Sequence, residues 1–131
     1  MRALIVEDNP VSSSYLKKIL PDCFECDIAD TGEKAIDSFI KYCKMGKSYD
    51  LILLDMILPN MGGDEVIKKL REKEIEIFGE NRSKILIQTA LDDIDALSDK
   101  FENYCDGYIN KPYDRYDVIG KLREVGFEVD Y

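Results

Sequence analysis

Five side chains that follow short apolar runs could act together in chemistry. Three are carboxylates, one is a hydroxyl and one is an ammonium: Glu7, Asp8, Asp55, Thr89 and Lys111. If the runs are parallel strands, their carboxyl ends meet at one edge of the sheet, which is where open α/β sheets bind ligands. The five side chains are therefore predicted to converge on one site.

A cation and a phosphoryl group suit such a site. Carboxylates a few ångströms apart repel one another, and each has a raised pKa unless a counter-charge is present. Mg²⁺ supplies that charge and is typically held by one or two carboxylates, waters and a phosphate oxygen. Lys111 can then neutralise one phosphoryl oxygen, and the Thr89 hydroxyl can donate to another. Asp55, at the end of the most central strand, is the natural site of an aspartyl-phosphate.

The composition narrows the possible chemistry further. The chain has 131 residues, 27 acidic and 18 basic side chains, a net charge of −9, and neither histidine nor tryptophan. A Ser-His-Asp triad, a zinc site with histidine ligands and a phosphohistidine carrier are therefore excluded. The acidic balance also argues against nucleic acid or an anionic membrane as a direct partner.

The length indicates one domain, residues 1–131, and the absence of recognisable targeting signals favours the cytoplasm. The apolar start Met1–Val6 is followed at once by acidic residues and is too short for a secretory signal or a membrane span. Four cysteines without such a signal favour reduced thiols. Cys23 and Cys26 could form a redox or zinc site, but idle thiols are the favoured interpretation because the pair leads into an edge strand.

Short apolar runs indicate β-strands. A continuous run is typical of a parallel strand buried on both faces, whereas alternation is typical of a half-covered edge strand. The continuous runs are Ala3–Val6, Leu51–Leu54 and Ile85–Ile87, the alternating residues are Phe24, Cys26 and Ile28, and the short fifth strand is Gly107–Ile109.

Segments with helical periodicity separate these strands. Asn9 and Pro10 supply an N-cap and a first helical residue. The five apolar stripes are Val11–Leu20, Ala35–Cys43, Val66–Leu70, Ile94–Tyr104 and Val118–Val125. Five successive βα units predict an α/β fold in which helices cover both faces of a doubly wound, five-stranded parallel sheet. The segment Lys73–Ser83 is predicted to be an extended loop before the fourth strand.

The motifs at the strand ends resemble those of the receiver domain of two-component response regulators, the family of the chemotaxis phosphoacceptor. The matching segments are Ala3–Asn9, Leu51–Gly63, Gln88–Ala90 and Gly107–Pro112. Their order at the correct strand ends is highly specific, and with the βα pattern the resemblance covers essentially the whole chain. It implies a flavodoxin-like fold with strand order 2-1-3-4-5.

The resemblance implies a role for each acidic residue. Asp55 is the expected acceptor of a phosphoryl group from the phosphohistidine of a partner, which fits the absence of histidine here. Glu7, Asp8 and Asp55 are the expected ligands of Mg²⁺, with the backbone carbonyl of Ile57 as a further ligand. The chain is not expected to be an enzyme beyond its own phosphorylation and dephosphorylation.

A switch is also implied. Lys111 is expected to bridge Asp55 and the phosphoryl group, and its bond to Pro112 is expected to be cis. Thr89 is expected to shift toward the phosphoryl oxygen, and Tyr108 to turn inward into the space that Thr89 leaves. This coupled movement would report phosphorylation.

Three residues depart from the usual family pattern. Glu7 replaces a more usual aspartate, and its extra methylene favours contact with Mg²⁺ through water. Ile57 and Leu91, two residues after Asp55 and Thr89, are apolar. Our hypothesis is that both screen the acyl phosphate from water and lengthen its lifetime.

The expected partners are proteins. A sensor histidine kinase or a histidine phosphotransfer protein would donate the phosphoryl group, and a downstream target would bind a face formed by Ile94–Tyr104, Tyr108 and Tyr113–Val125. Residues Gly126–Tyr131 are expected to be only a short C-terminal extension. No direct contact with nucleic acid or a membrane is expected.

Three other functions were weighed. A flavodoxin shares the sheet, but the acidic pair after the first strand would repel a flavin phosphate. A haloacid-dehalogenase-type phosphatase needs a second aspartate where Ile57 stands. A receiver that acts as an interaction module without phosphorylation remains the main alternative.

Overall fold

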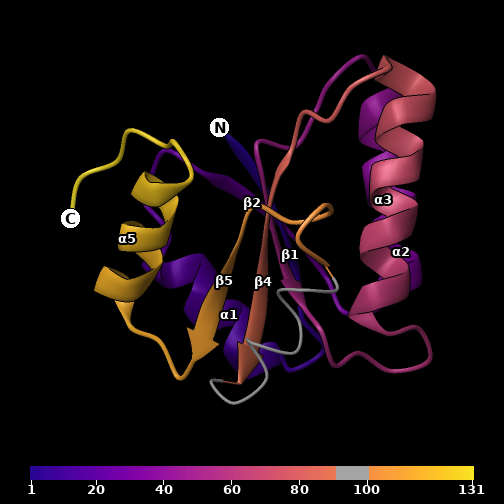
Figure 1. Cartoon of the computed structure of the whole chain (residues 1–131). Helices are drawn as coiled ribbons and strands as arrows, with labels where there is room; N and C mark the ends of the chain where they lie inside the picture. The colour runs from indigo at the N-terminus through magenta and orange to yellow at the C-terminus, as the bar shows by residue number, and fades with distance from the viewer. Residues whose placement is uncertain (91–100) are drawn as a thin grey trace.

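The apolar runs form a five-stranded parallel sheet. The computed structural model describes residues 1–90 and 101–131, and its strand order is β2-β1-β3-β4-β5 (Figure 1). The strands are β1 (Arg2–Val6), β2 (Glu25–Ala29), β3 (Leu51–Asp55), β4 (Lys84–Ala90) and β5 (Gly107–Lys111). This confirms the predicted flavodoxin-like fold and strand order.

Helices cover both faces of the sheet. Within the described residues they are α1 (Pro10–Ile19), α2 (Gly32–Lys44), α3 (Gly63–Phe78) and α5 (Arg115–Glu124). Figure 1 shows α1 and α5 on one side of the sheet and α2 and α3 on the other. The predicted helix Ile94–Tyr104 falls largely outside the described residues. No described helix is long and apolar enough to cross a membrane.

The alternation of the strands divides the core into two layers. Leu4, Val6, Ile52 and Leu54 pack with α2 and α3, and the residues between them pack with α1 and α5. Because both faces are covered, every residue of β3 is buried, which explains the continuous apolar runs. At the sheet edge, β2 instead leaves Ile28 exposed, as its alternating pattern predicts.

The predicted loop Lys73–Ser83 is wrong over its first half, because α3 continues to Phe78 and ends at Gly79 with φ of 75°. Glu74 explains the extension. Its carboxylate is 1% exposed and accepts from Arg71 at 2.8 Å and from the backbone N–H of Ser83 at 2.8 Å. The charged residues of this stretch thus include a buried anchor for the loop, and periodicity alone does not reveal that anchor.

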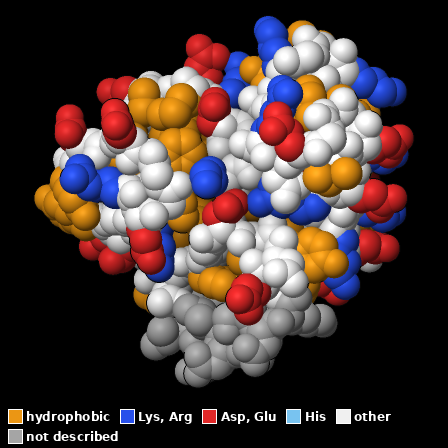
Figure 2. All heavy atoms as spheres, turned by 45° about the horizontal axis from the view of Figure 1, so that its top comes forward, with side chains coloured by type: hydrophobic (Ala, Val, Ile, Leu, Met, Phe, Trp, Pro, Cys, Tyr) orange, Lys and Arg blue, Asp and Glu red, His pale blue; other side chains and the backbone are white. Residues whose placement is uncertain are grey.

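Charges on the outer surface are mixed. Among the described residues on the face in Figure 2, acidic and basic side chains lie next to one another, with hydrophobic side chains between them. In the described structure as a whole, opposite charges pair across short distances, such as Arg2 with Glu25 at 2.7 Å and Lys73 with Glu76 at 3.1 Å. Interspersed charges of this kind are typical of a solvated surface.

Candidate functional site

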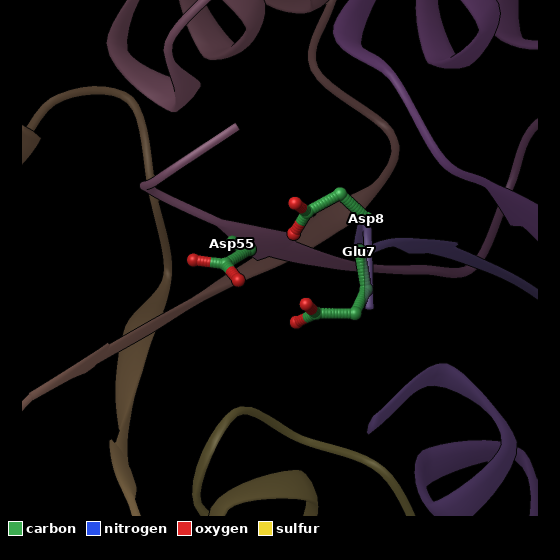
Figure 3. Close-up of side chains that lie close together, drawn as sticks. All are labelled: Glu7, Asp8 and Asp55. Carbon is green, nitrogen blue, oxygen red and sulfur yellow. The ribbon is translucent and has the colours of Figure 1, made fainter. Parts of the chain in front are cut away.

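Three carboxylates face one another where β1 and β3 end. The register sets Val6 beside Leu54, so Glu7 and Asp8 emerge next to Asp55. Figure 3 shows the three carboxyl groups directed toward a common space, and one oxygen of each lies within 4.8 Å of the others. Glu7 and Asp55 are 2% and 5% exposed, whereas Asp8 is open to solvent. The cluster is therefore walled by the protein and accessible from one side.

Lys111 at the end of β5 supplies a positive charge in contact with this cluster. Its Nζ lies 2.8 Å from Oδ2 of Asp55 and 3.5 Å from Oε2 of Glu7. The Lys111 side chain is half-buried, so these charge-assisted hydrogen bonds are only partly screened by water. One ammonium thus faces three carboxylates, which leaves an excess of negative charge when all three are ionised.

Backbone N–H groups hold the two buried carboxylates in place. The N–H of Ile57 donates to Oδ1 of Asp55 at 3.0 Å, so the two oxygens of Asp55 have different partners. The N–H of Asn9 donates to Oε1 of Glu7 at 3.2 Å. The side chain of Asn9 in turn caps α1 by accepting from Val11 and Ser12, as the sequence predicts.

The site perturbs the pKa of two of its charged groups. Burial, followed by the adjacent Asp55, raises the pKa of Glu7 to about 7, and Lys111 only partly opposes this rise. Burial lowers the pKa of Lys111, but Asp55 and Glu7 more than compensate, so that its pKa is raised overall. Lys111 therefore stays charged at neutral pH, whereas Glu7 is poised between its two forms.

The expected switch residues lie on β4 and β5. Thr89 is 5% exposed and follows Gln88, which pairs in register with Asp55. This register places Thr89 at the same sheet edge as the carboxylates. Tyr108 is half-buried, pairs with Ile87, and packs against the core layer on the α2 and α3 side. It lies three residues before Lys111, away from the strand end.

The remaining predicted positions are Ile57, Pro112 and Leu91. Ile57 is 81% exposed on the loop after Asp55. The bond between Lys111 and Pro112 is cis, as the resemblance implies. Leu91 lies outside the described residues.

A polar pair close to the site escaped the sequence analysis. The hydroxyl of Tyr113 donates to Oε1 of Gln88 at 2.9 Å, and Gln88 is completely buried. The signal was a polar residue that continues the apolar run Ile85–Ile87 of a central strand. Such a residue needs a buried partner, but the sequence does not reveal which one.

Cys23 and Cys26 do not contribute to the acidic cluster. Cys23 is exposed and Cys26 is half-buried, and both thiols are free. Burial raises the pKa of the Cys26 thiol, which opposes formation of the reactive thiolate. Among residues 1–90 and 101–131, the side chains grouped closely enough to hold a metal ion are Glu7, Asp8 and Asp55.

The chemistry of this donor set fits a hard divalent cation. Carboxylate oxygens are the ligands that Mg²⁺ prefers, and the open side at Asp8 leaves room for the waters that Mg²⁺ retains. The excess negative charge around Asp55 provides the electrostatic reason for a cation to enter.

Comparisons with known proteins agree with this geometry. The family model of the response regulator receiver domain matches residues 3–123. The chain therefore belongs to the response regulator receiver domain family of two-component signal transduction.

The relatives are longer regulators. The chain is 30% identical over 128 residues to the cell cycle transcriptional regulator CtrA of Caulobacter vibrioides, covering 95% of this chain and 50% of that protein. It is 32% identical over 124 residues to the transcriptional regulatory protein CusR of Escherichia coli, covering 94% of this chain and 50% of that protein. The chain thus spans about half the length of the curated relatives it matches.

Solved structures share the fold. One is the receiver domain of a sensor histidine kinase from Pseudomonas aeruginosa PAO1, which matches with a TM-score of 0.76 at 24% identity and covers 96% of this chain and 98% of that one. That protein has a magnesium ion coordinated in its active site cleft.

The raised pKa of Glu7 predicts a pH-dependent stability. The folded protein holds the Glu7 proton up to about pH 7, whereas the unfolded chain loses it near the ordinary glutamate pKa of 4.5. The contribution of Glu7 to the free energy of unfolding therefore falls as pH rises through this window. We expect the free energy of unfolding of Glu7→Gln, relative to that of wild type, to rise by about 1–3 kcal/mol from pH 5 to pH 8 in the absence of metal. Urea denaturation at the two pH values measures this difference.

Glu72 provides the matched control because it is exposed on α3. Glu72→Gln removes the same charge from the surface and should stay within about 0.5 kcal/mol of wild type at both pH values. If the difference between Glu7→Gln and wild type is the same at pH 5 and pH 8, the assignment of a raised pKa to Glu7 is wrong.

Proposed function

We propose that Asp55 accepts a phosphoryl group from the phosphohistidine of a sensor histidine kinase or a histidine phosphotransfer protein. The observation that carries the proposal is the contact of Lys111 with Asp55 at 2.8 Å beside two further carboxylates. Glu7, Asp8, Asp55 and the carbonyl of Ile57 are the groups that would hold Mg²⁺. When bound, Mg²⁺ would neutralise negative charge on the phosphoryl group and the carboxylates.

The residues of the chain have separate tasks in the transfer. An oxygen of Asp55 attacks phosphorus, the bond between phosphorus and the imidazole nitrogen breaks, and the nitrogen keeps the bonding electrons. The N–H of Ile57 fixes the orientation of the Asp55 carboxylate before the attack. Lys111 stabilises the charge on one oxygen of the transferred phosphoryl group, and the Thr89 hydroxyl donates to another of its oxygens.

Thr89 and Tyr108 would connect the site to a protein-binding face. A phosphoryl group on Asp55 would draw Thr89 toward it, and Tyr108 would turn inward into the space that Thr89 leaves. The proposed face for a downstream protein includes Tyr108 and Tyr113–Val125, with Ile94–Tyr104 largely outside the described residues. The transcriptional regulators among the relatives support a signalling role for this chain.

Mass spectrometry after incubation with acetyl phosphate and Mg²⁺ tests the acceptor. We expect one added phosphoryl group, dependent on Mg²⁺ and absent in Asp55→Asn, because the amide is not a competent nucleophile. Asp30→Asn is the control, since Asp30 is an exposed acid that follows β2 at the same sheet edge and pairs with Lys34. It should be phosphorylated like wild type.

A wild-type protein without an adduct under these conditions would refute phosphorylation of Asp55. It would favour the alternative in which the receiver acts as an interaction module without phosphorylation. An adduct that persists in Asp55→Asn would place the acceptor elsewhere.

Ile57 is proposed to shield the acyl phosphate. Its exposed aliphatic side chain stands on the loop beside Asp55 and can exclude water from the site opening. Ile57→Asn should speed hydrolysis of phosphorylated Asp55 by about three- to tenfold. The rate is measured from the loss of the phosphoryl adduct after acetyl phosphate is removed. Leu91, to which the same hypothesis applies, would be tested with Leu91→Glu.

Ile75→Asn is the control for this experiment because Ile75 is also exposed but lies far along α3. Its phosphoryl lifetime should match that of wild type. Unchanged or slower hydrolysis in Ile57→Asn contradicts the shielding role.

A further inference from the structure

Lys111 is held at the end of an outer strand. In the described sheet β5 pairs only with β4, and Lys111, its last residue, lies opposite Ala90. The ammonium stands at the tip of a flexible four-carbon chain, yet it must stay 2.8 Å from Asp55. Its position therefore depends on what restrains the segment directly after the strand.

Tyr113 restrains this segment from two sides. Its hydroxyl donates to Oε1 of Gln88 on β4 at 2.9 Å, and its backbone carbonyl accepts from the hydroxyl of Tyr15 on α1 at 3.2 Å. The rings of Tyr113 and Tyr15 also stack, with centroids 6.1 Å apart. These contacts attach the chain two residues after Lys111 to both β4 and α1.

Gln88 is unusual for a strand interior. It is completely buried, lies opposite Asp55 in the register of β3 and β4, and its Nε2 has no hydrogen-bond partner among the described residues. Its neighbour two residues earlier, Leu86, belongs to the core layer packed with α1 and α5. A carboxamide with an unmatched donor costs stability at a site where an apolar side chain would pack without that cost. Within the described part of the chain, its side-chain hydrogen bond is to Tyr113 and leads to the segment that carries Lys111.

Resting on the proposed function, we infer that Gln88 and Tyr113 are positioning residues for phosphoryl transfer. Their hydrogen bond fixes the end of β5 against β4 and so keeps the Lys111 ammonium on Asp55. Burial, together with the charges of Glu7 and Asp55, raises the pKa of Tyr113, so its hydroxyl keeps its proton at neutral pH and remains a donor.

The rate of phosphorylation of Asp55 by acetyl phosphate tests this pair. Tyr113→Phe should lower the maximal rate by about tenfold, because a displaced ammonium stabilises the transferred oxygens less well. The half-saturating acetyl phosphate concentration should change less than about twofold, since Lys111 remains present to attract the anion. Gln88→Leu should have the same effect, and the double variant should be no slower than either single variant.

Two comparisons separate positioning from folding. The double variant Gln88→Leu/Tyr113→Phe removes both polar partners and should regain thermal stability that Tyr113→Phe loses, while its maximal rate stays low. Tyr49→Phe is the matched control, because Tyr49 is a buried tyrosine whose hydroxyl donates to Asp27 at 2.7 Å. Tyr49→Phe should lose stability and keep the wild-type rate.

A wild-type rate in Tyr113→Phe, or a double variant that regains rate together with stability, would overturn the positioning role. Phosphorylation of the wild-type protein must be measured in parallel. Its absence would refute the proposed function itself, whereas wild-type phosphorylation with unaffected variants would refute only the role of the pair.

Discussion

Repulsion among closely spaced carboxylates, two of them buried, is the constraint on which this site depends. The parallel pairing of β1 with β3 brings Glu7 and Asp8 beside Asp55, and burial removes much of the water that would screen Glu7 and Asp55. Among residues 1–90 and 101–131, the ammonium of Lys111 is the cation that pairs with these carboxylates and opposes their repulsion. Burial raises the pKa of Glu7 most, and the adjacent Asp55 raises it further, because protonation relieves charge that Lys111 does not neutralise. A bound cation would relieve the same charge without protonation.

The strand ends, and with them most of the site, could be predicted from the sequence because parallel strands bury both faces. That burial makes each run continuously apolar, so its first polar residue marks the ligand-binding edge, as at Asp55. The length of α3 could not be predicted in this way. It depends on Glu74, which is buried by contacts with Arg71 and a loop that follows in the chain.

The contrast between local sequence patterns and contacts of distant residues also explains why Gln88 and Tyr113 could not be predicted to form a pair. They are 25 residues apart in the chain, and their contact joins β4 to the segment that follows β5, where Tyr15 of α1 also donates to the carbonyl of Tyr113. A polar residue in an apolar run reveals that a partner is needed, but tertiary structure selects the partner. Local patterns therefore locate the reactive groups, and long-range contacts determine how firmly each one is held.

Mg²⁺ binding measured by calorimetry at pH 7 in buffers of different ionisation enthalpy tests the charge balance most directly. If a cation replaces the proton as the counter-charge, binding should release about half a proton per ion from Glu7, whose pKa is about 7. This release should disappear in Glu7→Gln. Absence of Mg²⁺ binding, or binding without proton release in the wild-type protein, would contradict the account.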